Sequence, residues 1–269
     1  MGTSEFVMFR NTLHQRLRPG FTALAAALVV AGLALAGTTP ALAAEEGGLS
    51  DRANNDVANV ASLQRGARNF VNYCMGCHSA KYVRYNQLAR DLGMSEKQVI
   101  DNLMFSAARP TDTMDIAMRP ADGQRWFGIA PPDLSLMARS RGPDYIYNFL
   151  RTFYLDPSRP TGVNNLMLPN AAMPDVLWQL QGLQKAVFEE EAHNGVTQLV
   201  FRKFEEVSPG KLTPEEYDEF VRDTVNFLDY IGEPMKLKRQ SLGILVVAYL
   251  LVFGLFAYLL KQEIWKDVK

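Results

Sequence analysis

The pentapeptide Cys-Met-Gly-Cys-His at residues 74–78 constrains this chain more than any other feature of its 269 residues. C-x-x-C-H is the attachment signature of a c-type haem, whose vinyl groups form thioethers with the two thiols while the histidine becomes an axial iron ligand. Two intervening residues let one helical turn present Cys74 and Cys77 to one edge of the porphyrin, and the next position carries His78 beneath the iron. The motif therefore predicts one covalent haem c.

Two other uses of closely spaced cysteines fit the sequence less well. A structural zinc ion takes four ligands, whereas the rest of the chain offers no further cysteine and only His14 and His193. A thioredoxin-like redox pair would open a helix after a strand of a βαβ unit, and the residues before Cys74 do not have a strand pattern.

The first 43 residues have the three parts of a secretory signal peptide. Three arginines form a basic region, residues 21–37 are almost entirely Ala, Leu, Val and Gly, and Ala41-Leu42-Ala43 is an A-x-A cleavage signal. A first transmembrane helix is the alternative, but the short apolar run, the small residues and the cleavage signal favour removal. Covalent haem attachment requires export in bacteria, so the signal and the haem motif support each other.

Charge and cysteine content describe the exported part further. Removal of residues 1–43 takes away three arginines and one glutamate and leaves 25 basic and 28 acidic side chains, a net charge of about −3. That balance argues against a nucleic-acid partner. Because the haem uses both cysteines, no disulfide is expected, and the core and the cofactor must hold the domain together.

Residues 242–260 form a stretch of 19 residues without a charge, long enough to cross a hydrocarbon core of about 30 Å as a helix. A buried core helix is the alternative, although such a helix rarely runs so far without a polar residue. Basic residues flank both ends, so charge does not set the orientation of the helix in the membrane. Export of the haem domain sets it instead. We expect a periplasmic haem domain at 44–235, a basic juxtamembrane segment at 236–241, a transmembrane helix at 242–260 and a cytoplasmic tail at 261–269, in the inner membrane.

Between its ends the chain is expected to be mainly α, with long loops and one small β-hairpin. Helices are predicted from Ala61 to the haem motif, over 82–92, from the capping box at Ser95 to about Phe105, from Pro143, and from a second capping box at Thr213. Residues 109–132 and 156–174 are expected to be irregular. Strands over 185–190 and 197–204 are expected to pair around Asn194-Gly195. Short helices joined by long loops around one flat cofactor are typical of a c-type cytochrome fold.

The second axial ligand determines what the iron can do. A filled position restricts it to electron transfer, whereas an open one binds oxygen, peroxide or nitric oxide. His193 lies at the predicted hairpin turn, where a histidine is usually solvated. Most of the 11 methionines are expected in the core, but Met173 follows Ala171 and Ala172, which allow the backbone near the porphyrin, between prolines that stiffen the loop. Met167, in the same loop, is the second candidate.

Further segments resemble the cytochrome c1 family, the membrane-anchored haem subunits of ubiquinol–cytochrome c reductase (cytochrome bc1) complexes. The resemblance covers essentially the whole mature chain. It rests on Arg65-Gly66 with Phe70 and Tyr73, Met118-Arg119-Pro120, Ala130-Pro131-Pro132-Asp133-Leu134-Ser135, Arg139-Ser140-Arg141, Asp144-Tyr145, the Met173-Pro174 loop, and Phe227-Leu228 to Glu233-Pro234. Many cytochromes share C-x-x-C-H, but the Ala-Pro-Pro-Asp-Leu-Ser block followed by a C-terminal anchor is much more specific.

The resemblance implies a set of site residues. Cys74 and Cys77 would hold the haem, and His78 and Met173 would be its axial ligands. Arg141 would lie against a haem propionate, although without the resemblance it is typical of a surface arginine. Pro132 would pack beside the axial histidine, where a carbonyl can determine the imidazole tautomer.

The implied function is electron transfer within a respiratory, quinol-oxidising complex. The haem would accept one electron from a Rieske iron–sulfur protein and pass it to a soluble or membrane-tethered cytochrome c. Cytochrome b would be a further partner in the membrane, and the complex would be dimeric. The chain itself would not oxidise quinol. The alternatives are a membrane-tethered haem sensor or ligand-binding cytochrome with an open iron site, and an anchored shuttle cytochrome outside any complex.

Two features depart from the family pattern. Some relatives have further cysteines that form a disulfide, which this chain cannot form. Residues 181–209 are longer than the corresponding mitochondrial segment, so the resemblance assigns them no role. Their acidic residues, with Glu205 and Glu206, either steer a basic soluble cytochrome c by charge or form a solvated face, and the sequence favours neither.

Overall fold

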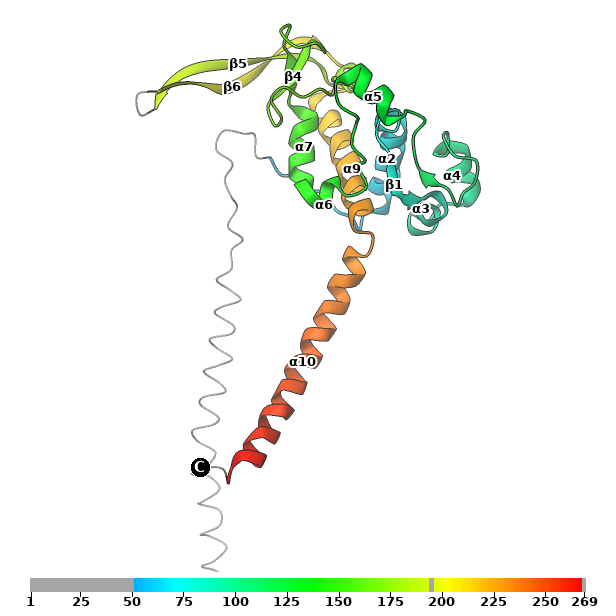
Figure 1. The fold of residues 1–269 in the computed structure, drawn as a ribbon, viewed down its shortest axis with the longest axis vertical. Coiled ribbons are helices and arrows are strands. Elements are labelled where there is room, and N and C mark those ends of the chain that lie inside the picture. Colours follow the sequence, from blue (N-terminus) through cyan, green and yellow to red (C-terminus); the bar gives the residue numbers. More distant parts are fainter. Residues whose placement is uncertain (1–50, 194–195, 268–269) are drawn as a thin grey trace, which may run out of the picture. The chain divides into compact units, whose positions relative to one another are not determined.

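The computed structural model describes residues 51–193 and 196–267, which are mainly helical with three two-stranded antiparallel sheets (Figure 1). The helices are α2 (Val60–Asn69), the π-helical turn η1 (Phe70–Cys74), α3 (Tyr85–Asp91), α4 (Glu96–Asn102), α5 (Pro120–Phe127), α6 (Met137–Arg141), α7 (Pro143–Arg151), α8 (Trp178–Gln181), α9 (Pro214–Gly232) and α10 (Lys236–Trp265). The strands pair as β1 (Ala80–Arg84) with β2 (Thr113–Met114), β3 (Phe153–Leu155) with β4 (Val163–Asn165), and β5 (Gly182–His193) with β6 (Val196–Pro209). The predicted mainly α fold with a hairpin and a long apolar C-terminal helix is confirmed.

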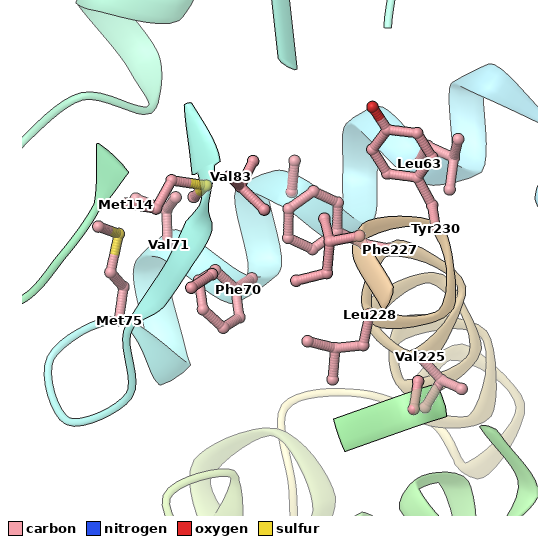
Figure 2. Close-up of a cluster of buried hydrophobic side chains, with 14 of the residues drawn as sticks. Leu63, Phe70, Val71, Met75, Val83, Met114, Val225, Phe227, Leu228 and Tyr230 are labelled. Atoms are coloured by element: carbon pink, nitrogen blue, oxygen red, sulfur yellow. The ribbon is translucent and has the colours of Figure 1, made fainter. Parts of the chain in front are cut away.

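Helices α2 and α9 pack closely and form the centre of the core. A Cβ added at Gly66 of α2 would lie 2.0 Å from the carbonyl oxygen of Asp223 and 2.7 Å from the Cβ of Phe227, so only glycine permits this approach. The fully buried rings of Phe70 and Phe227 meet with their centroids 5.6 Å apart. Figure 2 shows these two rings with Leu63 and other side chains gathered between η1, α2 and α9. This packing positions the residues that lead into the haem motif.

Buried polar groups connect the same two helices. The carboxylate of Asp223, only 5% exposed, accepts hydrogen bonds from Ser62 Oγ at 2.6 Å and from Nε and Nη2 of Arg65 at 2.5 and 2.9 Å. Asn226 Nδ2 donates to Ser62 Oγ at 2.9 Å. A buried carboxylate left without its partners is costly, so this network favours one register of α2 against α9.

The helix predicted over 82–92 is wrong at its start. Residues 80–84 form β1, with Ala80 opposite Met114 and Arg84 opposite Thr113, and α3 begins only at Tyr85. The pairing strand lies about thirty residues further along the chain, so local periodicity does not reveal it. The two segments expected to be irregular also contain regular structure, because 109–132 includes β2 and α5 and 156–174 includes β4.

Both predicted capping boxes are confirmed. The hydroxyl of Ser95 accepts from Gln98 N and begins α4, and the hydroxyl of Thr213 accepts from Glu216 N and begins α9. Helix α4 ends at Asn102, slightly before the expected end. The predicted hairpin is also present but longer, since its strands pair from Gly182 opposite Pro209 to His193 opposite Val196.

Helix α10 is long and apolar enough to cross a membrane, and its most apolar stretch of 18 residues has a mean hydropathy of 2.5. Its first turn includes the basic segment expected beside the membrane. There Lys236 Nζ lies 2.8 Å from Asp229 Oδ2, and Arg239 Nε lies 2.5 Å from Glu233 Oε1. These ion pairs connect the start of α10 to the end of α9. The signal peptide predicted at 1–43 lies outside the described residues.

Candidate haem site

The C-x-x-C-H segment leaves α2 through a π-helical turn. Met75 N donates to Phe70 O across five residues at 2.9 Å. Cys77 N and His78 N then both donate to the carbonyl oxygen of Cys74, at 3.0 and 2.9 Å. The turn therefore displays two thiols and an imidazole within five residues. Single π-turns within helices occur frequently at functional sites.

Both cysteines are half-buried free thiols. Burial, followed by the proximity of Cys77, raises the pKa of the Cys74 thiol to about 12, and burial also raises the pKa of Cys77. Both sulfurs are therefore protonated at neutral pH in the polypeptide itself, and Cys74 packs against the hydrophobic core.

The imidazole of His78 is buried and oriented. Its Nδ1 lies 2.7 Å from the carbonyl oxygen of Pro132. A carbonyl can only accept, so Nδ1 carries the proton and Nε2 keeps its lone pair for a metal. Burial lowers the pKa of His78, while the bond to Pro132 and the charge of Asp133 act in the opposite direction. The histidine is thus neutral near pH 7, as metal binding requires.

A clamp centred on Asp133 holds Pro132 in place. Asp133 Oδ2 accepts from Ser79 Oγ at 2.7 Å and from Lys81 N at 3.0 Å, and Oδ1 accepts from Ser135 N at 2.9 Å. The backbone adds a bond from Leu134 N to Ser79 O at 2.8 Å. Burial opposes ionisation of Asp133, but these hydrogen bonds together lower its pKa. The segment after the haem motif and the segment bearing Pro132 are therefore fastened together.

The predicted second ligand lies in the loop after β4. Met173 is partly buried and packs against the same hydrophobic cluster as Cys74. Ala171, two residues earlier, is 4% exposed. Met167, the second candidate, is half-buried and donates its backbone N–H to Asn165. The side chain of His193 lies outside the described residues.

Arg141 is the last residue of α6 and lies beside an aromatic ring at the start of α7. Its guanidinium carbon is 5.4 Å from the centroid of the Tyr145 ring, which itself packs against the core. The stacking reduces the number of conformations open to an exposed arginine.

The residues present fit a covalently attached haem. Two free thiols at C-x-x-C-H spacing, a neutral imidazole with Nε2 available, and a thioether against the same core provide the required attachment atoms and ligand types. Sequence reasoning missed the clamp by Asp133, although this residue lies within the Ala-Pro-Pro-Asp-Leu-Ser block. It also missed Ser79, which no local pattern marks.

Comparison with known proteins agrees with this arrangement, since residues 53–268 match the Cytochrome C1 family. The chain belongs to the cytochrome c1 family. It is 47% identical to cytochrome c1 of Allochromatium vinosum over 241 residues, which cover 90% of this chain and 98% of the relative. It is 30% identical to cytochrome c1 of Rhodospirillum rubrum over 287 residues, covering 90% and 97%. A Nitrosomonas europaea protein named ammonia monooxygenase gamma subunit is 45% identical over 220 residues, covering 81% and 88%.

Membership in the cytochrome c1 family has three implications. It implies a covalent haem c, electron transport within a bc1-type complex, and cytochrome b and a Rieske protein as the other members of that complex. The long apolar helix α10 suggests membrane anchoring, as expected for this family.

Proposed function

We propose that this chain is the haem-bearing exit subunit of a cytochrome bc1-type complex. It takes single electrons from the Rieske iron–sulfur protein and passes them to a soluble or membrane-tethered cytochrome c. The observation that carries the proposal is the neutral His78 imidazole, oriented by Pro132 O within a turn that also displays two free thiols.

The roles of the site residues follow from their chemistry. Cys74 and Cys77 would hold the haem through thioethers, and the Nε2 of His78 and the sulfur of Met173 would bind its iron. Arg141 would neutralise a propionate. The haem, when bound, supplies reversible one-electron chemistry, and two protein ligands leave no position for oxygen or carbon monoxide.

The surroundings of His78 favour a high reduction potential. Its N–H donates to a neutral carbonyl rather than to a carboxylate, so the ring does not gain imidazolate character. Burial of the ring disfavours the additional positive charge of the oxidised state. A thioether ligand supplied by Met173 would act in the same direction.

The proposed location follows from the two ends of the chain. The signal peptide at 1–43 exports the domain at 44–235 to the periplasm, and the helix within 242–260 retains it at the inner membrane with residues 261–269 in the cytoplasm. Tethering raises the local concentration of the haem domain near its donor without requiring tight binding.

Absorption spectroscopy of the purified full chain tests the ligand assignment. Wild type and Met167→Leu should show the methionine–iron charge-transfer band and should not bind carbon monoxide when reduced. Met173→Leu should lose the band, bind carbon monoxide and have a lower midpoint potential. Loss of the band in Met167→Leu and its survival in Met173→Leu would overturn the assignment.

Purification from membranes tests the partners. The chain should copurify with a b-type cytochrome and a Rieske protein, and the preparation should reduce cytochrome c with quinol. Copurification with an ammonia-oxidising complex instead, or rapid stoichiometric carbon monoxide binding by the wild-type chain, would refute the proposed function.

A further inference from the structure

Two adjacent asparagines at the end of β4 are buried. Asn165 is 1% exposed and Asn164 is 8% exposed. They pair with Phe153 and Tyr154 of β3, and neighbouring side chains of a strand point to opposite faces. Buried amide side chains are uncommon unless their hydrogen bonds are satisfied, so the partners of these two show what they do.

The amide of Asn165 faces the loop that follows it. Its Oδ1 accepts from the backbone N–H groups of Met167 at 2.9 Å and Leu168 at 3.2 Å, and from Thr152 Oγ1 at 3.4 Å. Its Nδ2 donates to the carbonyl oxygen of Phe149, in α7, at 2.8 Å. One side chain therefore connects α7 and Thr152, which follows it, to two residues near the start of the loop.

Asn164 holds the other end of the same loop. Its Oδ1 accepts from the backbone N–H of Asn170 at 2.8 Å, and its Nδ2 donates to Asp156 Oδ2 at 2.9 Å. Asn170 has φ +66°, a left-handed conformation that turns the chain, and Ala171 N then donates to Leu168 O at 3.1 Å. The loop is closed three residues before Met173.

The two asparagine side chains thus accept hydrogen bonds from loop N–H groups that, in a strand or helix, would be bonded to backbone carbonyls. The N–H groups of Met167, Leu168 and Asn170 all bond to the two amides. Backbone donors near the interior require partners, so these bonds select one course for residues 166–171. Ala171, at the end of this course, is buried, and Met173 follows it against the core.

We propose that Asn164 and Asn165 are positioning residues for the methionine ligand, because together they shape the loop that carries Met173. The inference rests on the proposed function through the role of Met173, and it assigns a task to residues that do not touch the iron. Their loss should release the loop and weaken methionine ligation more than it weakens the fold.

The test uses the full chain with haem attached. Asn165→Leu keeps the branching and the number of heavy atoms of the side chain but removes both loop bonds. Net hydrogen-bond strengths correspond to a factor of about two to ten each, so the loss of two bonds should lower the ratio of ligated to unligated methionine roughly fourfold to a hundredfold. The pH at which the charge-transfer band disappears should then fall by about 0.6 to 2 units, and the Met167 and Leu168 amides should lose protection from hydrogen exchange.

Asn148→Leu is the matched control. Asn148 is also buried, 2% exposed, and donates from Nδ2 to Asp51 O and Asp144 O, both at 2.8 Å, so its bonds involve no residue of the loop. Its loss should lower the melting temperature similarly but leave the pH midpoint of the band unchanged. Equal midpoints for Asn165→Leu and the control would overturn the inference.

Further variants test the same role if Asn165→Leu gives no clear result. Asn165→Asp retains the oxygen acceptors and should retain more of the band than the leucine variant. If Asn165→Leu does not fold, Asn164→Ser provides the test, because it removes the bond to Asn170. The pH midpoint of the charge-transfer band should then shift downward. An unshifted midpoint would refute the proposal. Met173→Leu identifies the ligand independently, so a wrong ligand and a wrong positioning role give different results.

Discussion

Replacement of Gly66 by alanine should force α2 and α9 apart. The new Cβ would lie 2.0 Å from Asp223 O, and such contacts are essentially never shorter than 3.0 Å, so the helices must separate by about 1 Å. The obstacle is backbone of α9 rather than the end of a flexible side chain, so local rotation cannot relieve it. The variant tests whether the packing of this helix pair holds the haem turn.

The expected magnitude follows from the contacts across the interface. A radial gap of 0.5–1 Å forfeits about a quarter to a half of each dispersion contact, and overpacked cores lose about 1–3 kcal/mol, occasionally more. Alanine regains about 1 kcal/mol of helix propensity. Since residues such as Phe70, Ala67 and Phe227 are fully buried here, we take the upper end of the overpacking range, about 3 kcal/mol, and expect a net loss of about 2 kcal/mol. For a domain of this size that lowers the melting temperature by about 4–8 °C.

The assay is thermal unfolding of the full chain in detergent, followed by haem absorbance and by circular dichroism. Gly243→Ala provides the control, because Gly243 also lies within a helix but has nothing within 4 Å of an added Cβ. It should leave the melting temperature unchanged. If Gly66→Ala melts within about 2 °C of wild type, α2 and α9 are not in rigid contact and the reasoning is refuted.

Two further predictions concern hydrogen-bonded side chains outside the haem motif. The Tyr230 hydroxyl donates to Asp91 at 2.6 Å, and burial, together with this bond, raises the pKa of Tyr230. The contribution of Tyr230 to the free energy of unfolding is therefore complete below the unfolded pKa of about 10 and is lost as the pH rises above it. Tyr230→Phe should cost about 1–2 kcal/mol at pH 8. At pH 11 the cost should be about 1.4 kcal/mol smaller, as measured by denaturant unfolding. Asp133→Asn removes a negative charge and loosens the Pro132 carbonyl against His78, so redox titration should show a higher midpoint potential, and a lower one would contradict the clamp.

Local patterns were sufficient wherever the physical cause was local. The hydroxyls of Ser95 and Thr213 cap helices that begin one residue later, and each box is contained in four residues. The haem motif is similarly self-contained, since the Cys74 carbonyl closes its own turn. Features of this kind were predictable without a fold.

Features that depend on distant partners were not predictable. Strand β1 exists because Ala80 meets Met114, a pairing that helical periodicity over 82–92 concealed. The clamp at Asp133 requires Ser79, which lies 54 residues earlier. The role inferred for Asn165 depends on which backbone N–H groups of the following loop lie within hydrogen-bond distance of its side chain. The sequence of the loop does not predict that geometry.

The π-helical turn before the haem motif has a consequence for which length changes the chain can accept. A π-turn holds one residue more than the α-helical turn it replaces. Deletion of a single residue from 70–73 could restore an α-helical turn there and leave the following residues nearly in place, because the π-turn and the α-turn each complete about one rotation. Cys74 would then keep its contact with the core. A deletion within the regular helix at 60–69 has no such relief and would rotate the first thiol by about 100° relative to the α2 core residues, so we expect a change of one residue to be accepted at 70–73 and not at 60–69.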